Sequence, residues 1–81
     1  MKKFIMLMDK KIFLLDRQHY RPEMVENLTE KDLEEWVAAW DYENEYTIIK
    51  IDANGYNSVD DALFEEGVLF PEDYYIFSFG F

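Results

Sequence analysis

Short apolar stretches of strand length alternate with polar and turn-forming residues along the chain. Four of them, at residues 4–8, 12–15, 46–52 and 74–79, are each expected to form a β-strand. The first two are separated by Asp9-Lys10-Lys11, a polar break that favours a hairpin turn. Both are apolar at successive positions, which is typical of central strands that are covered on two sides.

The apolar residues change to helical spacing between Glu30 and Trp40. Thr29 precedes this segment as an N-cap residue, and Asp32 stands where the second side chain of a capping box belongs. Apolar residues then recur at positions i, i+3, i+4 and i+7, namely Leu33, Trp36, Val37 and Trp40. We therefore predict an amphipathic helix whose apolar stripe, with both tryptophans, packs in the core.

A second, shorter helix is expected after the Asn54-Gly55 turn. Ser58 is its predicted N-cap, and Gly67 stands at the C′ position where glycine ends many helices. Pro22 indicates a single helical turn earlier in the chain. The pattern predicts one small α+β domain over residues 1–81, in the order β-β-α-β-α-β. Its sheet is expected to be roughly four-stranded, mostly antiparallel or mixed, and packed by two helices.

The residue types exclude several kinds of chemistry. The 81 residues include no cysteine, so a disulfide scaffold, a thiolate zinc site and a cysteine nucleophile are ruled out. His19 is the single histidine, and no glycine-rich phosphate loop is present. We therefore expect no metal, no cofactor and no enzymatic activity.

Hydropathy gives an expectation for location. No stretch approaches the ~18 apolar residues of a membrane span. The apolar run at residues 4–8 is shorter than the ~7–15 residues of a secretory signal core. We expect a cytoplasmic protein that does not enter a membrane.

The charges are distributed unevenly. The whole chain has a formal net charge of −10, which argues against direct binding to nucleic acid or to an anionic membrane. Residues 1–22 carry six basic and two acidic residues, whereas residues 23–81 carry two basic and sixteen acidic residues. After Lys50 there is no basic residue. Either the basic first part balances the acidic helices, or an acidic face is offered to a basic partner, and both can hold together.

The acidic excess leads to the first functional hypothesis. The protein would be a non-enzymatic protein-binding module, in the manner of an acidic nucleic-acid mimic that inhibits a nucleic-acid-handling protein by occupying its basic site. Carboxylates on helix faces present negative charge at spacings loosely like those of phosphates. The partner-binding residues predicted on outward helix faces are Glu30, Glu34, Glu35, Asp60, Asp61, Glu65 and Glu66.

The last predicted strand leads to the alternative hypothesis. Its odd positions are all aromatic: Tyr75, Phe77, Phe79 and Phe81. A small domain has limited interior, so part of this row is expected to remain exposed as an association surface. The protein would then be a structural or assembly subunit that forms a homodimer or docks on a larger complex, and its acidity would mainly serve solubility.

Overall fold

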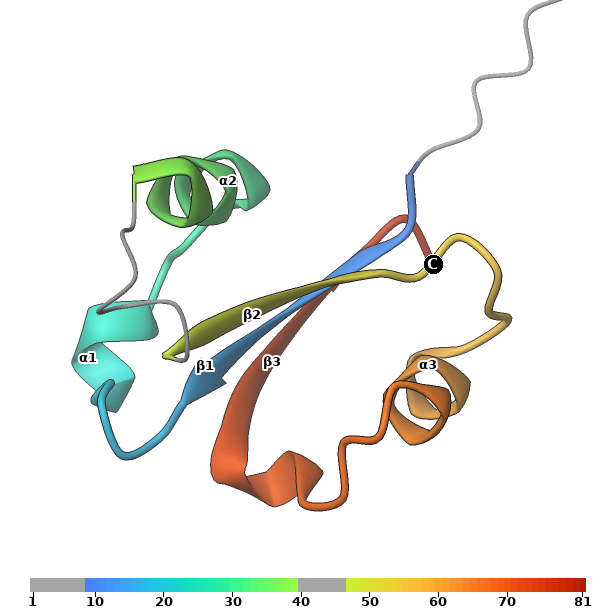
Figure 1. Cartoon of the computed structure of the whole chain (residues 1–81). Coiled ribbons are helices and arrows are strands. Elements are labelled where there is room, and N and C mark those ends of the chain that lie inside the picture. The colour runs from blue at the N-terminus through green and yellow to red at the C-terminus, as the bar shows by residue number, and fades with distance from the viewer. Residues whose placement is uncertain (1–8, 40–46) are drawn as a thin grey trace, which may run out of the picture.

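An antiparallel sheet with helices on both faces organises the computed structural model, which describes residues 9–39 and 47–81 (Figure 1). The α+β class predicted from the sequence is confirmed. Within the described residues the sheet has three strands, and the strand predicted at residues 4–8 lies outside them. The elements are β1 (Lys11–Asp16), α1 (Pro22–Val25), α2 (Glu30–Ala39), β2 (Ile48–Asp52), α3 (Val59–Glu65), the 3-10 helix η2 (Pro71–Asp73) and β3 (Tyr74–Phe79).

β1 is the central strand of the sheet. The strand order is β2-β1-β3, and both neighbours run antiparallel to β1. Residues Ile12 to Leu15 have no exposed surface, which confirms the prediction of a strand covered on two sides. β2 and β3 pair with the two edges of β1. The hairpin predicted between residues 4–8 and 12–15 involves residues outside the described part of the chain.

The face of the sheet beneath α1 and α2 holds one hydrophobic core. Phe13 and Leu15 of β1 point into it and meet Leu33, the fully buried residue of α2. Trp36 packs against the same core and stacks on Tyr20, with ring centroids 6.1 Å apart and an interplanar angle of 18°. Trp36 is therefore part of the core, although it is not fully buried, while Trp40, the other tryptophan of the predicted stripe, lies outside the described residues.

The opposite face of the sheet packs against α3. Here Ile12 and Leu14 of β1 join Ile51 of β2, and α3 contributes Ala62 and Leu63. The alternation of β1 side chains between the two faces thus links both helical layers to one strand. Figure 1 shows α1 and α2 on one side of the sheet and α3 on the other.

Local capping signals fix the ends of the two longer helices. Thr29 Oγ1 accepts a hydrogen bond from the Asp32 backbone N–H at 3.2 Å, and an Asp32 carboxylate oxygen accepts one from the Thr29 N–H at 3.0 Å. The predicted capping box is therefore confirmed. Ser58 caps α3 by accepting from the N–H of Asp61. Gly67 follows α3 with φ +82° and donates to the Phe64 carbonyl, as in a Schellman motif.

Candidate protein-binding surface

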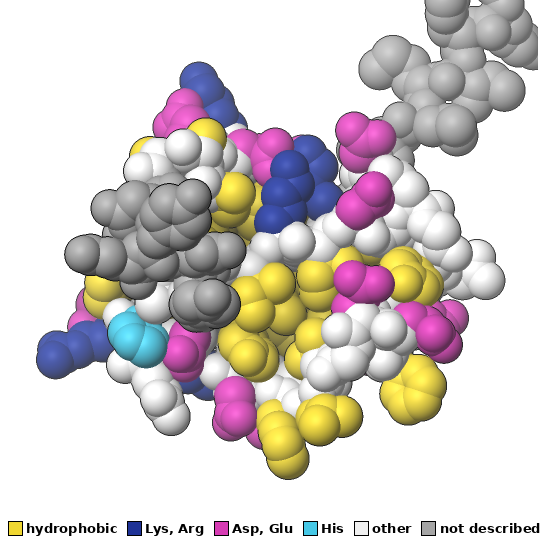
Figure 2. All heavy atoms as spheres, viewed as in Figure 1, with side chains coloured by type: hydrophobic (Ala, Val, Ile, Leu, Met, Phe, Trp, Pro, Cys, Tyr) yellow, Lys and Arg dark blue, Asp and Glu magenta, His cyan; other side chains and the backbone are white. Residues whose placement is uncertain are grey.

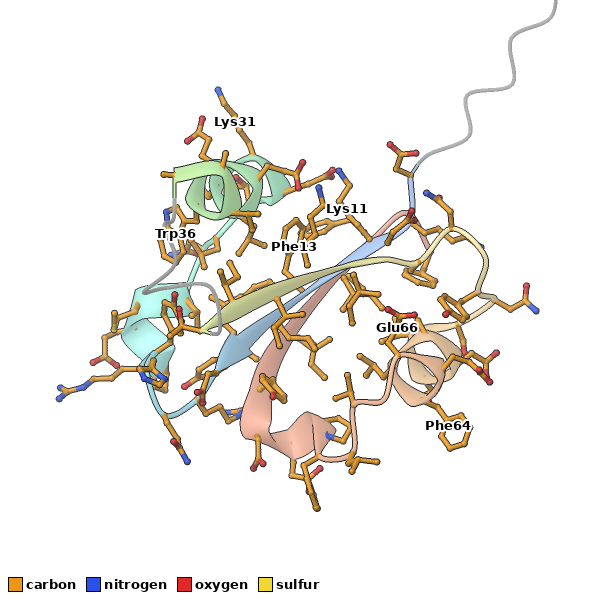
Figure 3. All side chains as sticks on the ribbon, in the orientation of Figure 1. Lys11, Phe13, Lys31, Trp36, Phe64 and Glu66 are labelled. Atoms are coloured by element: carbon orange, nitrogen blue, oxygen red, sulfur yellow. The ribbon has the colours of Figure 1, made fainter. Side chains whose placement is uncertain are left out.

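The acidic residues of α2 do not share one environment. Lys11 Nζ lies 2.7 Å from Glu30 Oε2 and 3.8 Å from Glu34 Oε2, and Lys50 Nζ lies 2.7 Å from Glu34 Oε1. Positions 30 and 34 are one turn apart on the flank of α2 that overlooks β1 and β2, and Figure 3 shows Lys11 between α2 and the sheet. Glu30 and Glu34, which the sequence predicted as partner-binding residues on an outward helix face, therefore pair with lysines of the same chain. Glu35, in contrast, is exposed.

These ion pairs shift the pKa values of Lys11 and Glu34. The hydrogen bond to Glu30 raises the pKa of Lys11 above its ordinary value of 10.5. The hydrogen bond from Lys50 lowers the pKa of Glu34 below 4.5. Two lysines of the sheet thus balance the inner flank of α2, in line with the charge-balance interpretation of the sequence.

The acidic residues of α3 have a different setting. Asp60, Asp61, Glu65 and Glu66 are all exposed, and we call them the α3 acidic surface. Glu66 Oε2 accepts a hydrogen bond from the Tyr56 hydroxyl at 2.9 Å, and this bond raises the pKa of Tyr56. In Figure 2 the basic side chains gather near α2 and at the α1 corner, whereas the charged side chains around α3 are acidic. The charge asymmetry of the sequence therefore becomes an asymmetry of this face of the molecule.

The aromatic row of β3 packs mostly inward. Tyr75, Phe77 and Phe79 are half-buried against the core beneath α2, and Phe79 meets Phe13 edge to face at 5.9 Å. Phe81, which follows the strand, keeps 48% of its surface exposed. The structure therefore gives three members of the predicted interface row a place in the core.

A groove that the sequence did not predict opens on the α3 side of the sheet. It lies between β2, the turn that follows α3 and the start of β3, and its volume is ≈ 420 Å³. Leu69 and Phe70 on its wall are 80% and 59% exposed, and Glu66 and Asp73 bring carboxylates to it. We call it the β2–α3 groove; its apolar lining is Ile49, Ile51, Val68, Leu69, Phe70 and Tyr74.

The groove exists because α3 is too short to cover its side of the sheet. Seven helical residues span about 10 Å, whereas strands of five or six residues span roughly 17–20 Å. Leu14 of β1 pairs with Ile49 of β2 and with Ile76 of β3. α3 does not fully cover these two partners, which are 36% and 38% exposed. The signal that could have revealed the groove is the run Val68-Leu69-Phe70, because connecting loops are usually polar.

Over residues 9–39 and 47–81, no three His, Cys, Asp or Glu side chains are grouped to hold a metal ion. The exposed ring of His19 places Nδ1 2.9 Å from an Asp16 carboxylate oxygen, as a locally bonded surface histidine does. None of the described helices combines the length and the apolar character needed to cross a membrane.

Comparisons with known proteins do not identify a family for this chain. No protein-family model, no curated protein and no solved structure matches it.

Proposed function

We propose that this protein is a non-enzymatic binding module whose α3 acidic surface occupies a basic site on another protein. The observation that carries the proposal is the clustering of four exposed carboxylates on the α3 acidic surface. Among the described residues none of the four forms an ion pair, although the Lys10 ammonium lies close by, 2.9 Å from the Tyr56 carbonyl oxygen. On α2, by contrast, Glu30 and Glu34 already pair with lysines of the sheet. A one-signed field of this kind accelerates association with an oppositely charged partner.

The composition of α3 supports a role in recognition. Glu65 lies in the last turn of α3, where the helix dipole disfavours a negative charge by about 0.3–1 kcal/mol. No basic residue offsets it in that turn. Because Glu65 does not stabilise the helix, a contact with another molecule explains its presence better than a contribution to folding stability does.

The partner class follows from the charge. A nucleic-acid-handling protein has a basic site of the kind that four clustered carboxylates complement, so we propose an inhibitor that acts as a nucleic-acid mimic. Direct binding to nucleic acid or membrane is not part of this proposal. The cytoplasmic location expected from the sequence stays a prediction.

The test compares two charge reversals of equal size. Asp60→Lys with Glu65→Lys alters the α3 acidic surface while leaving the Ser58 cap and the Glu66 hydrogen bond in place. The control, Glu23→Lys with Glu26→Lys, makes the same change beside α1. A partner isolated from the source organism by binding to the wild-type protein at low salt should no longer bind the α3 variant and should still bind the control. Duplex DNA should compete with the wild-type protein for the basic site of that partner. Equal binding of both variants would show that the α3 acidic surface only confers solubility.

The alternative function is an assembly subunit, and one observation favours it. Phe81 remains 48% exposed beside β3, and Ile76 of the same strand is 38% exposed. Sedimentation velocity at micromolar concentration tests this alternative directly. A dimer that Phe81→Ser dissociates would place the assembly function first, whereas a monomer would remove the homodimer.

A further inference from the structure

We infer that the β2–α3 groove is the anchor site for the partner, receiving an apolar or aromatic side chain from a basic protein segment. This inference rests on the proposed function, because it names the contact that would turn electrostatic attraction into specific binding. Charge alone steers an encounter, whereas buried apolar anchors supply most of the affinity at protein interfaces.

The apolar part of the groove has the exposure expected of an uncovered contact. Leu69 and Phe70 are 80% and 59% exposed on one wall, and Ile49 is 36% exposed on the other. The volume of ≈ 420 Å³ falls within the ~300–1,000 Å³ range of sites that hold compact ligands. In Figure 2 a contiguous apolar area occupies the middle of this face, with acidic side chains on either side of it and below it, and lysine or arginine side chains above it.

The charges facing the groove are acidic. Glu66 and Asp73 belong to its lining. Lys50 also lines it, but its ammonium lies 2.7 Å from Glu34 Oε1 and 5.9 Å from the ring centroid of Phe13, so its charge is directed to the α2 face. The charged groups that an incoming segment would meet in the groove are therefore the carboxylates of Glu66 and Asp73.

Arg17, whose backbone N–H donates to the Asp73 carbonyl of η2, likewise directs its side chain to the α2 face of the sheet. The Arg17 guanidinium lies 4.2 Å from the ring centroid of Tyr75, and its Nε donates to the Tyr74 carbonyl at 3.2 Å. Tyr75 packs against the core beneath α2. Arg17 therefore does not neutralise the groove.

The occupant follows from the combination of apolar walls and acidic rim. A segment with an aromatic or large aliphatic side chain flanked by lysine or arginine matches both features. The anchor would contact Ile49, Leu69 and Phe70, and its basic neighbours would pair with Glu66 and Asp73. Burial of the anchor would also cover the apolar area that the short α3 leaves open.

The experiment uses a peptide of one tryptophan between two pairs of lysines, titrated into the full-length, ¹⁵N-labelled protein and followed by amide chemical shifts. A second peptide with alanine in place of tryptophan carries the same charge. If the groove is the anchor site, the tryptophan peptide should change the amide chemical shifts of Ile49, residues 68–70 and Tyr74 in a saturable way. The alanine peptide should not change them.

Two protein variants provide a matched comparison. Leu69→Ser removes a groove side chain that is 80% exposed, and Phe64→Ser removes one that is 79% exposed but points away from the sheet (Figure 3). Leu69→Ser should weaken binding of the tryptophan peptide about tenfold. Phe64→Ser should leave the affinity unchanged.

The outcomes separate the two proposals. If both peptides shift only residues of the α3 acidic surface, and do so equally, the groove inference fails while the proposed function stands. If neither peptide shifts that surface at ~50 mM NaCl, where screening is weak, the proposed function fails as well. Absence of saturable groove shifts with the tryptophan peptide overturns the inference. A dimer that Leu69→Ser dissociates would assign the groove to a second copy and would also overturn it.

Discussion

Replacing Glu34 by glutamine tests whether α2 is held to the sheet by its ion pairs. Glu34 is the carboxylate that both lysines share, with Lys50 Nζ at 2.7 Å and Lys11 Nζ at 3.8 Å. The glutamine keeps the shape and a carbonyl acceptor but removes the negative charge. The matched control is Glu35→Gln, which makes the same change at the next, exposed position of the helix.

The expected magnitude follows from the exposure of the pairs. Exposed ion pairs contribute ~0.2–1 kcal/mol each. Lys50 and Glu34 are 39% and 38% exposed, so their pair belongs in that range, while Lys11, at 15%, is screened less. Glu34→Gln should therefore lower the free energy of unfolding by about 1 kcal/mol, which corresponds to roughly 4–8 °C in Tm for a domain of this size. Glu35→Gln should change it by less than ~0.5 kcal/mol.

The pH dependence gives a second signature of the same pair. Because the pKa of Glu34 is lowered in the folded state, its contribution is fully present above the ordinary value of 4.5 and is lost as the pH falls through the lower folded-state value. Urea unfolding of wild type and Glu34→Gln should therefore differ at pH 7 and converge below about pH 4.5. In ~1 M NaCl the difference at pH 7 should shrink.

Two results would refute this reasoning. Equal stabilities of Glu34→Gln and Glu35→Gln at pH 7 would mean that the ion pairs contribute nothing measurable. A loss that persists unchanged at low pH would mean that packing, rather than charge, is responsible. The first of these results would also make Glu34 available again as a partner-binding residue.

Two further predictions concern local structure and can be read from urea unfolding at pH 7. Ser58→Ala should lower stability by about 1 kcal/mol, because the N–H of Asp61 loses its capping acceptor, and an unchanged midpoint would show that water replaces the cap. Gly80→Ala should lower stability by about 1–2 kcal/mol or more, since Gly80 has φ +87° and an added Cβ would lie 2.5 Å from the Asp9 carbonyl oxygen. Gly55→Ala, where nothing lies within 4 Å of the added Cβ, is the control and should not destabilise.

The helix ends could be predicted from the sequence because their signals are local. Thr29, Asp32, Ser58 and Gly67 each act within a few positions, through side-chain caps or through a positive φ. Their structural roles follow from residue type and spacing alone.

The pairing of strands could not be predicted in the same way. β1 is apolar on both faces, so the alternation of side chains does not reveal which face or which neighbour it meets. The sequence favoured the nearby residues 4–8 as the partner of β1. The structure pairs β1 with β2 and β3, whose residues lie far along the chain, and residues 4–8 lie outside its described part.

The candidate surface shows the same division between local and distant information. The acidity of α3 is visible in the sequence, but the pairing of Glu34 with Lys50 depends on β2 lying beneath α2. The β2–α3 groove likewise depends on how much of the sheet a seven-residue helix covers. Both features arise from tertiary arrangement, and only the groove leaves a sign in the sequence, the apolar loop Val68-Leu69-Phe70.

The central position of β1 has a consequence for how fast the chain folds. Lys11 pairs with Phe79 and Asp16 with Tyr74, so the sheet is completed only when opposite ends of the described chain meet. Closing such long loops costs entropy before the pairing compensates for it, and domains rich in distant contacts fold more slowly than helical domains of similar size. Until β3 pairs with β1, one edge of a strand whose four central residues, Ile12 to Leu15, are all apolar remains open, and an open edge of this kind favours aggregation during folding.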